Sequence, residues 1–288
     1  MAYPLMEHLI GKGFLYCGKY YRVRSELTES LQKPVDIRIY YETVRVKDGV
    51  LLFVEDHLQR LVNSVKGLEN FPVNTSSILA EAYSFIDMDG LKDGSIRIVL
   101  TKEVLLIHQA DISIPTEEQF ENGINTSILN WERKTPNLKI FRGDYKTTVN
   151  EKFKEENAHG LPFELVLTDN EGKLYEGSMS NLFVIRDGKV YSAPDNKILI
   201  GITRKRVMEA LKRSGLELQI GTFKPEELAP AKDAVFVSST PFDILPVRYM
   251  DGYEFRSSDN EVLKMISKMY KEYTSEYINA AKRALNGQ

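Results

Sequence analysis

RGDYKTTVN (142–150) and LYEGSMSNLF (174–183) are the two blocks of this sequence that decide its fold and its chemistry. Lys146 lies in the first block and Glu176 in the second. Between them, FELVLTD (163–169) is apolar and β-rich, which predicts a buried strand. We expect this stretch to present a nucleophilic amine and a carboxylate to one flat ligand.

Composition excludes several classes of protein. The 288 residues are 42% hydrophobic and 27% charged, with a net charge of −3, which is typical of a globular protein. No Lys/Arg block is long enough for nucleic-acid binding, and the single Cys17 cannot form an internal disulfide. The first residues lack the pattern of a signal peptide, and the apolar runs are too short to span a membrane. We therefore expect a cytoplasmic protein without a metal site, a nucleic-acid partner or a membrane partner.

The first part of the chain predicts strands followed by helices. Tyr- and Val-rich runs before residue 54 predict short strands, with a hairpin turn at KDGV (47–50). Leucines and valines at helical spacing predict a helix over 55–68, and a second helix is predicted over 76–86. Residues 95–114 read as another hairpin, which turns at Thr101–Glu103.

A polar stretch without apolar periodicity, PTEEQFENG (115–123), is the predicted linker between two lobes. The predicted domains are a smaller lobe at 1–114, this linker, and a larger lobe at 124–288. The larger lobe should hold a hairpin at 181–193, a helix that begins at Gly201–Thr203, and a strand-like stretch at 233–247. The mixture predicts an α+β fold in which helices pack against largely antiparallel sheets.

Lys146 and Glu176 are the candidate catalytic pair. A lysine attacks a carbonyl only when its amine is partly neutral, and a short extended segment around Lys146 could hold it on an inner face. Glu176 precedes Gly177 and a run of hydroxyl residues, a composition that suits close approach of a ligand to the backbone. The alternatives are a solvated surface lysine and an ordinary hairpin turn.

Three further features could bind an anion. Gly201, Ile202 and Thr203 begin a predicted helix, whose N-terminal N–H groups suit a phosphate, although Thr is also a common helix cap. Ser238–Thr240 ends an apolar run, where hydroxyls serve as anion ligands or as turn formers. Arg60 lies on a predicted helix next to apolar Leu61. There it would either bind an anion or lie at the edge of the core with its charged end in solvent. His57 and His108 show no local pairing with a carboxylate in the sequence and are weaker acid–base candidates.

The order of these features resembles the fold-type IV pyridoxal-phosphate enzymes. That family includes branched-chain and D-amino-acid aminotransferases and aminodeoxychorismate lyases. The resemblance covers nearly the whole chain and is carried by the blocks YYETVRVKDGVLLFVEDHLQRL (40–61), RGDYKTTVN (142–150), LTDNEGKLYEGSMSNLFVIRDGKVY (167–191), ILIGITRKRV (198–207) and VFVSSTPFDILPV (235–247). It implies a two-lobe α+β fold, with a smaller N-terminal α/β lobe and a larger C-terminal lobe that holds a barrel-like mixed sheet flanked by helices.

The resemblance also implies residue roles and a cofactor, pyridoxal 5'-phosphate. Lys146 resembles the lysine that forms the Schiff base, and Glu176 the carboxylate that pairs with the pyridine nitrogen. Arg60 resembles the arginine on the phosphate, and Tyr41 an aromatic residue facing the active site. The other implied cofactor-binding residues are Ser180, Asn181, Gly201, Ile202, Thr203, Ser239 and Thr240. Family members are homodimers with each active site at the lobe interface, so a homodimer is expected.

The chain departs from the family pattern in three places. The Asn-Tyr pair that many members carry after the lysine is absent, and Tyr41 or Tyr145 could replace its tyrosine. The loop that binds the substrate carboxylate in D-amino-acid enzymes is reduced to TKEVLLIHQ (101–109), where Lys102 or His108 could serve. Lys139, in PNLKI, competes with Lys146 because other members place their lysine after a proline; the flanking residues favour Lys146.

The sequence leaves three functions open. The first is an aminotransferase that acts on a small amino acid, such as a branched-chain one, and a 2-oxo acid. The second is a lyase that releases pyruvate from 4-amino-4-deoxychorismate with the same cofactor. The third is a catalytically silent member that acts as a binding protein, which the retained lysine, glutamate and phosphate residues argue against.

Overall fold

The computed structural model describes residues 2–286 and divides the chain into two compact units. Unit 1 comprises Met1–Ser113, Leu138–Lys146 and Ser275–Gln288. Unit 2 comprises Ile114–Asn137 and Thr147–Thr274. Within the described part of the chain, no helix is both long and apolar enough to cross a membrane.

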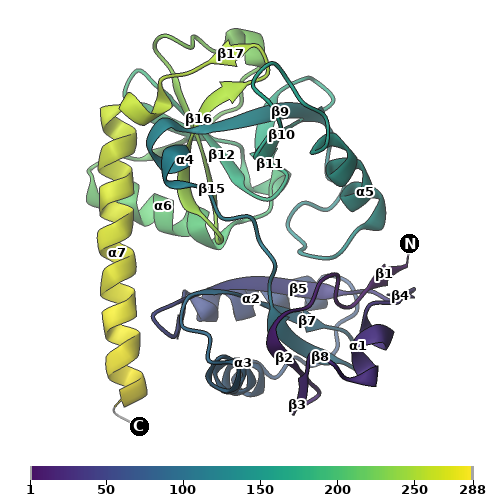
Figure 1. Ribbon diagram of the computed structural model, residues 1–288. Helices are drawn as coiled ribbons and strands as arrows, with labels where there is room; N and C mark the ends of the chain where they lie inside the picture. The colour runs from purple at the N-terminus through teal and green to yellow at the C-terminus, as the bar shows by residue number, and fades with distance from the viewer. Residues whose placement is uncertain (1, 287–288) are drawn as a thin grey trace. The chain divides into compact units, whose positions relative to one another are not determined.

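Unit 1 is built on an antiparallel sheet with the strand order β3-β2-β8-β7-β5-β6 (Figure 1). Two predicted hairpins are confirmed: Val46 pairs with Leu51, and Leu100 pairs with Leu105. The strands are β2 (Ile10–Tyr16), β3 (Lys19–Arg22), β5 (Tyr40–Lys47), β6 (Val50–Leu51), β7 (Gly94–Leu100) and β8 (Leu105–Gln109). A two-stranded ribbon, β1 (Tyr3–Pro4) with β4 (Pro34–Val35), and the short helix α1 (Glu26–Leu31) complete the N-terminal region.

Helices α2 (Val54–Lys66) and α3 (Thr75–Asp89) pack on one face of this sheet, as the apolar spacing predicts. Alternate residues of the strands, among them Val44, Ile96 and Ile98, are buried against them. The opposite face carries a second apolar cluster that includes Phe14, Val99 and Leu106. The two faces therefore present different side chains, and residues one position apart on a strand belong to different environments.

Unit 2 contains a six-stranded mixed barrel. The strand order is β11-β10-β9-β16-β15-β12, and the pairing of β11 with β12 closes the ring. Strand β9 pairs in parallel with β10 and β16, and the other pairs in the ring are antiparallel. The strands are β9 (Ile124–Asn130), β10 (Glu164–Thr168), β11 (Leu174–Gly177), β12 (Asn181–Arg186), β15 (Ala234–Ser239) and β16 (Asp243–Met250). Strands β13 (Lys189–Ser192), β14 (Leu218–Ile220) and β17 (Tyr253–Glu254) extend the sheet.

Alternation along the barrel strands separates two apolar cores. Leu182 and Val237 belong to one cluster, whereas Phe183 and Phe236 stack on each other in a second, with 4.6 Å between ring centroids. This second cluster includes residues of α6 (Ile202–Arg213) and α7 (Glu261–Asn286), the two helices beside the barrel in Figure 1. The expected α+β fold, with a barrel-like sheet flanked by helices, is confirmed.

Residues 115–123, the predicted linker, include helix α4 (Glu117–Asn122), whose first turn is closed by a reciprocal capping box between Thr116 and Gln119. One local prediction is wrong. The segment around Lys146 was expected to be extended, but it lies in helix α5 (Gly143–Lys152). Asp144 in the first turn and Lys152 in the last complement the helix dipole, and no proline interrupts the run.

Candidate active site

Glu176 lies at the point where the barrel closes. The only register pair between β11 and β12 joins Glu176 to Asn181, across the four-residue connection Gly177–Ser180. Asn181 also pairs with Ser238 on the neighbouring strand β15. The closure of the sheet therefore fixes the backbone on both sides of the predicted carboxylate.

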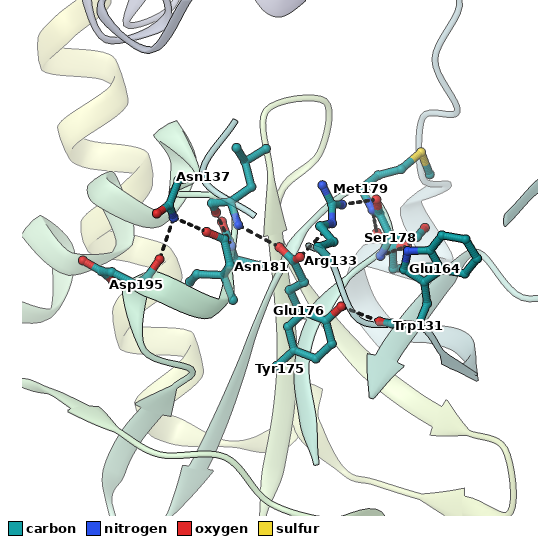
Figure 2. A network of polar contacts seen from close by, with 12 residues as sticks. Trp131, Arg133, Asn137, Glu164, Tyr175, Glu176, Ser178, Met179, Asn181 and Asp195 are labelled. Atoms are coloured by element: carbon teal, nitrogen blue, oxygen red, sulfur yellow. Dashed lines mark hydrogen bonds and ion pairs between the residues drawn. The ribbon is translucent and has the colours of Figure 1, made fainter. Parts of the chain in front are cut away.

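The Glu176 carboxylate is buried, with 1% of its side chain exposed, and both of its oxygens are engaged (Figure 2). Oε1 lies 2.8 Å from Nε of Arg133, and Oε2 accepts a hydrogen bond from the backbone N–H of Leu199 at 3.1 Å. Arg133 also donates to the carbonyl of Ser178 at 3.1 Å. A cation and an N–H donor stabilise the charged carboxylate and fix its orientation.

A second buried carboxylate, Glu164, holds the connection between β11 and β12 (Figure 2). It accepts hydrogen bonds from the hydroxyl of Ser178 at 2.6 Å, from the Ser178 N–H at 3.1 Å and from the Met179 N–H at 3.3 Å. Burial raises the pKa of Glu164 despite these hydrogen bonds, which oppose the shift. The loop after Glu176 is therefore anchored from inside the barrel.

The start of α6 is attached to the same site through Asn181. The Asn181 side chain donates to the carbonyl of Leu199 at 2.8 Å, and a Cβ added at Gly201 would lie 2.0 Å from its Oδ1. Only glycine allows this approach. Ile202 and Thr203, both buried, form the first turn of the helix, where backbone N–H groups have no intrahelical acceptor.

The remaining predicted residues of unit 2 lie beside this network. The Ser239 hydroxyl donates to the carbonyl of Met179 at 2.7 Å, and this bond ties the end of β15 to the loop after Glu176. Thr240 follows in the turn that leads to β16, and Ser180 is buried. The structure thus brings together all predicted cofactor-binding residues of unit 2: Glu176, Ser180, Asn181, Gly201, Ile202, Thr203, Ser239 and Thr240.

In unit 1, Arg60 belongs to a buried group with Glu42 and His57. Arg60 donates to both oxygens of Glu42, from Nε at 2.7 Å and from Nη2 at 2.6 Å. His57 Nδ1 lies 2.6 Å from the same carboxylate. Burial opposes the charge on Glu42, but Arg60 and His57 outweigh it and lower the pKa of that carboxyl to about 2. Burial also lowers the pKa of His57, and the charges of Arg60 and Lys139 add to the shift against the effect of Glu42.

The two competing lysines have different surroundings in unit 1. Lys139 Nζ lies 4.5 Å from the centroid of the Tyr41 ring, and its backbone N–H donates to Ser64 on α2 at 3.1 Å. The next residue, Ile140, pairs with Tyr40 at the start of β5. Lys146 Nζ instead lies 3.7 Å from the carboxylate of Glu7, with a third of its side chain exposed.

The tentative substrate residues Tyr41 and His108 both lie in unit 1. Tyr41 stacks on Phe141 with 4.1 Å between centroids. His108 is buried beside Arg97 on the next strand, where burial and the Arg97 charge lower its pKa to about 4. His108 is therefore neutral at pH 7 and does not serve as a cation for a carboxylate.

Sequence reasoning missed three of the charged residues that shape these sites. Glu42 and Glu164 had a detectable signal, since each is a carboxylate within an otherwise apolar strand; Glu42 also shares its strand face with Val44 and Val46. Arg133 had none, because it lies in an irregular polar segment between β9 and α5. His57, considered without a carboxylate, in fact has Glu42 as its partner.

Comparison with known proteins assigns the family. The family model described as "Amino-transferase class IV" matches residues 40–250, which is most of the chain. The chain belongs to the class IV aminotransferase family. Its members depend on pyridoxal phosphate and act on amino acids and 2-oxo acids.

Similar proteins within the family carry different names. A D-alanine aminotransferase of Bacillus licheniformis is 24% identical over 74% of this chain and 78% of its own. A putative branched-chain-amino-acid aminotransferase of Methanocaldococcus jannaschii is 25% identical over 82% of this chain and 87% of its own. An aminodeoxychorismate lyase of Bacillus subtilis is 24% identical over 83% of this chain and 86% of its own.

Solved structures share the fold. The branched-chain amino acid aminotransferase of Escherichia coli superposes with a TM-score of 0.74 at 23% identity, covering 90% of this chain and 93% of its own. The T.th. branched-chain amino acid aminotransferase with pyridoxamine 5'-phosphate has a TM-score of 0.76 at 21% identity, with coverage of 93% and 95%.

The residues of this chain fit pyridoxal phosphate. The buried, oriented Glu176 carboxylate suits a protonated ring nitrogen, and the first turn of α6 presents N–H groups suited to a phosphate. Arg60 is held by Glu42 through Nε and Nη2, an arrangement that fixes the direction of the guanidinium.

Replacing Gly201 by alanine should disturb the Glu176 site. The new Cβ displaces the Asn181 side chain and breaks its bond to Leu199, at a cost of about 1–3 kcal/mol. Affinity for pyridoxal phosphate should fall as well. Gly252→Ala is the matched control, because nothing lies within 4 Å of its added Cβ. Urea unfolding and cofactor titration measure both effects, and equal behaviour of the two variants would contradict the assigned packing.

Replacing Glu42 by glutamine should destabilise the protein by about 3–5 kcal/mol at pH 7, because Arg60 loses its buried partner. The pKa of Glu42 is lowered to about 2 in the folded protein, so its contribution is complete above about pH 4.5 and is lost as the pH falls toward 2. The difference between wild type and variant should shrink over that range.

Glu69→Gln provides the control for Glu42, since exposed Glu69 accepts a hydrogen bond from the Tyr40 hydroxyl at 2.9 Å. It should cost about 1 kcal/mol or less. Urea unfolding followed by circular dichroism, between pH 7 and pH 3, gives both comparisons. A Glu42→Gln effect that stays constant over this range would refute the charge-based explanation.

Proposed function

We propose that this protein is a pyridoxal-phosphate-dependent aminotransferase that moves an amino group between a small amino acid, such as a branched-chain one, and a 2-oxo acid. The observation that carries the proposal is the buried Glu176 carboxylate, held by Arg133 and the Leu199 N–H at the closure of the barrel. The cofactor supplies an electron sink for charge that develops at the substrate Cα.

Glu176 would hold a proton on the pyridine nitrogen through a charge-assisted hydrogen bond. Arg133 orients the carboxylate and stabilises its charge, so that the carboxylate does not need to reorganise during the reaction. Glu164 acts indirectly. It holds the loop after Glu176, and the Ser178 carbonyl of this loop accepts a hydrogen bond from Arg133. Each of these residues is buried or half-buried, which excludes competing water.

Lys139 is our proposed amine, with Lys146 as the alternative that the flanking residues favour. Lys139 lies against Tyr41 and close enough to His57 to affect its pKa, which places it near the Arg60 group. Lys146 lies on a helix, where its Nζ forms an ion pair with the Glu7 carboxylate at 3.7 Å. The proposed amine, once released by the incoming substrate, would move the proton at the substrate Cα.

The phosphate would be held by Ile202 and Thr203 at the start of α6, and the resemblance to the family implies Arg60 as a further phosphate ligand. Helix N-termini bind phosphate through free N–H groups and the helix dipole, and arginine adds a permanent charge. Such fixation holds the ring in register for proton transfer.

A lyase that releases pyruvate from 4-amino-4-deoxychorismate is the second candidate, because a relative of that name is as similar as the named aminotransferases. Both reactions use the same residues, and substrate loops decide between them. We also propose a homodimer, as the resemblance to the family implies.

A substrate panel tests the proposal. The purified protein, loaded with pyridoxal phosphate, is mixed with individual L- and D-amino acids and a 2-oxo acid, and amino transfer is measured. Parallel samples with 4-amino-4-deoxychorismate report pyruvate. We expect transfer from at least one small amino acid and a shift of the cofactor absorption band on its addition; pyruvate release without amino transfer would establish the lyase instead.

Glu176→Gln is the informative variant for this assay. It keeps the shape and the contact with Leu199 but removes the charge, so amino transfer should fall by orders of magnitude. Glu171→Gln, at an exposed turn of the same unit, is the control and should leave transfer unchanged. Equal rates in the wild type and Glu176→Gln would disprove the role of Glu176.

A further inference from the structure

A charged cluster in unit 1 includes Lys146, the alternative amine, and three residues to which no role has been assigned above. It consists of Tyr3, Glu7, Arg97 and Lys146, and we call it the Glu7 cluster. The Glu7 carboxylate accepts a hydrogen bond from the Tyr3 hydroxyl and lies 3.2 Å from Arg97 Nη1 and 3.7 Å from Lys146 Nζ. One carboxylate therefore faces two cations that come from distant parts of the sequence.

Aromatic rings connect this cluster to the proposed amine. Tyr3 stacks on Phe141 with 4.6 Å between centroids, and Phe141 stacks on Tyr41 with 4.1 Å. The Arg97 guanidinium carbon lies 5.6 Å from the centroid of the Tyr41 ring and 5.7 Å from that of Phe141. The rings and the guanidinium form one continuous surface on the sheet face opposite α2 and α3.

Lys139 lies at the Tyr41 end of this row of rings. Its Nζ lies 4.5 Å from the centroid of the Tyr41 ring, and the Arg97 guanidinium carbon lies 5.6 Å from the same centroid. The amine nitrogen and the guanidinium carbon are therefore no more than about 10 Å apart. That span is comparable to the length of an amino acid with an extended side chain.

The charges of the cluster are defined at neutral pH. Burial opposes ionisation of Glu7, but the Tyr3 hydroxyl and the Lys146 and Arg97 charges outweigh it and lower the pKa of its carboxyl. Burial raises the pKa of the Tyr3 hydroxyl, which stays neutral. His108, beside Arg97, is neutral because its pKa lies at about 4. Glu7 is thus the charged carboxylate that faces Arg97 and Lys146 in the cluster.

Arg97 retains a donor that the protein does not use. Its Nε is buried and has no hydrogen-bond partner among residues 2–286, although Nη1 faces Glu7. A buried guanidinium N–H without an acceptor costs free energy, which a ligand oxygen would recover. Glu7 therefore occupies only Nη1 of Arg97, and the guanidinium would be open to the carboxylate of a ligand if the Glu7 charge were removed.

We propose that Glu7 is a specificity-determining residue: its carboxylate occupies the Arg97–Lys146 cations and excludes substrates that carry a second carboxylate. This inference rests on the proposed function, in that Lys139 marks the reacting end of the substrate. It assigns the protein to amino acids and 2-oxo acids with uncharged side chains. The rings Tyr41 and Phe141 contact an apolar side chain, and Glu7 repels a terminal carboxylate that would otherwise pair with Arg97.

Glutarate and valerate are the probes, because both are unbranched five-carbon acids and differ only in the second carboxylate. Binding of each is measured by calorimetry to the protein loaded with pyridoxal phosphate, as wild type and as Glu7→Gln. Glutamine keeps the size of Glu7 and removes its charge. We expect glutarate to bind Glu7→Gln at least about tenfold more tightly than wild type, whereas valerate affinity changes by less than about twofold.

Two further variants separate specificity from general charge and packing. Glu29→Gln removes an equal charge at an exposed position on α1 and should change neither affinity. Adding Arg97→Met to Glu7→Gln should abolish the gain for glutarate. An unchanged glutarate-to-valerate ratio in Glu7→Gln, equal gains for both acids, or no binding of either acid to either protein would overturn the inference.

The absorption spectrum of the same samples keeps this test separate from that of the proposed function. A cofactor band that fails to respond to every amino donor counts against the aminotransferase. The glutarate-to-valerate ratio still decides the role of Glu7, because binding is measured without turnover.

Discussion

The closure of the six-stranded barrel is the constraint on which the Glu176 site depends. A single register pair, Glu176 with Asn181, joins the two ends of the ring. The four residues between them are held by Glu164 from inside the barrel, and Asn181 reaches the segment before α6 through Leu199. Because Glu176 and Asn181 both bond to the backbone of Leu199, the carboxylate and the first turn of the helix are positioned together, which a ligand with a ring nitrogen and a phosphate requires.

Buried charge is used differently in the two units. In unit 2, the buried Glu176 carboxylate is paired with Arg133 and accepts a hydrogen bond from the Leu199 N–H. In unit 1, Glu42 holds Arg60 and His57, and the cost of burying three polar groups is offset by short, charge-assisted bonds. Such groups contribute little net stability compared with an apolar core, so their presence is better explained by the need to orient Arg60 than by stability.

Much of the fold could be predicted because its signals are local. Apolar spacing predicted α2 and α3, and the sequences KDGV and RDGK predicted two tight hairpins; in the second, Asp187 and Gly188 adopt positive φ angles of 51° and 71°. Helix α4, within residues 115–123, was not predicted because a six-residue helix has too little apolar periodicity to detect, and its capping box is the only signal.

Residues of the candidate site could be predicted only where they lie in a recognisable sequence motif. Glu176, Asn181 and Gly201 lie in blocks with a recognisable order, and the structure brings them together in unit 2. Arg133, Glu164 and Glu42 act through contacts between residues distant in sequence, so neither spacing nor composition reveals their partners. The two lysines differ in the same way: flanking residues favour Lys146, whereas the surroundings of Lys139, known only from the fold, favour Lys139.

The identity of the reacting amine tests the account most directly. The protein loaded with pyridoxal phosphate is reduced with borohydride, digested, and mapped by mass spectrometry for the lysine that carries the cofactor. We expect a single label on the peptide that contains Lys139, and loss of that label in Lys139→Ala. A label on Lys146 would contradict the assignment of the amine, and the absence of a label on either lysine would contradict the function itself.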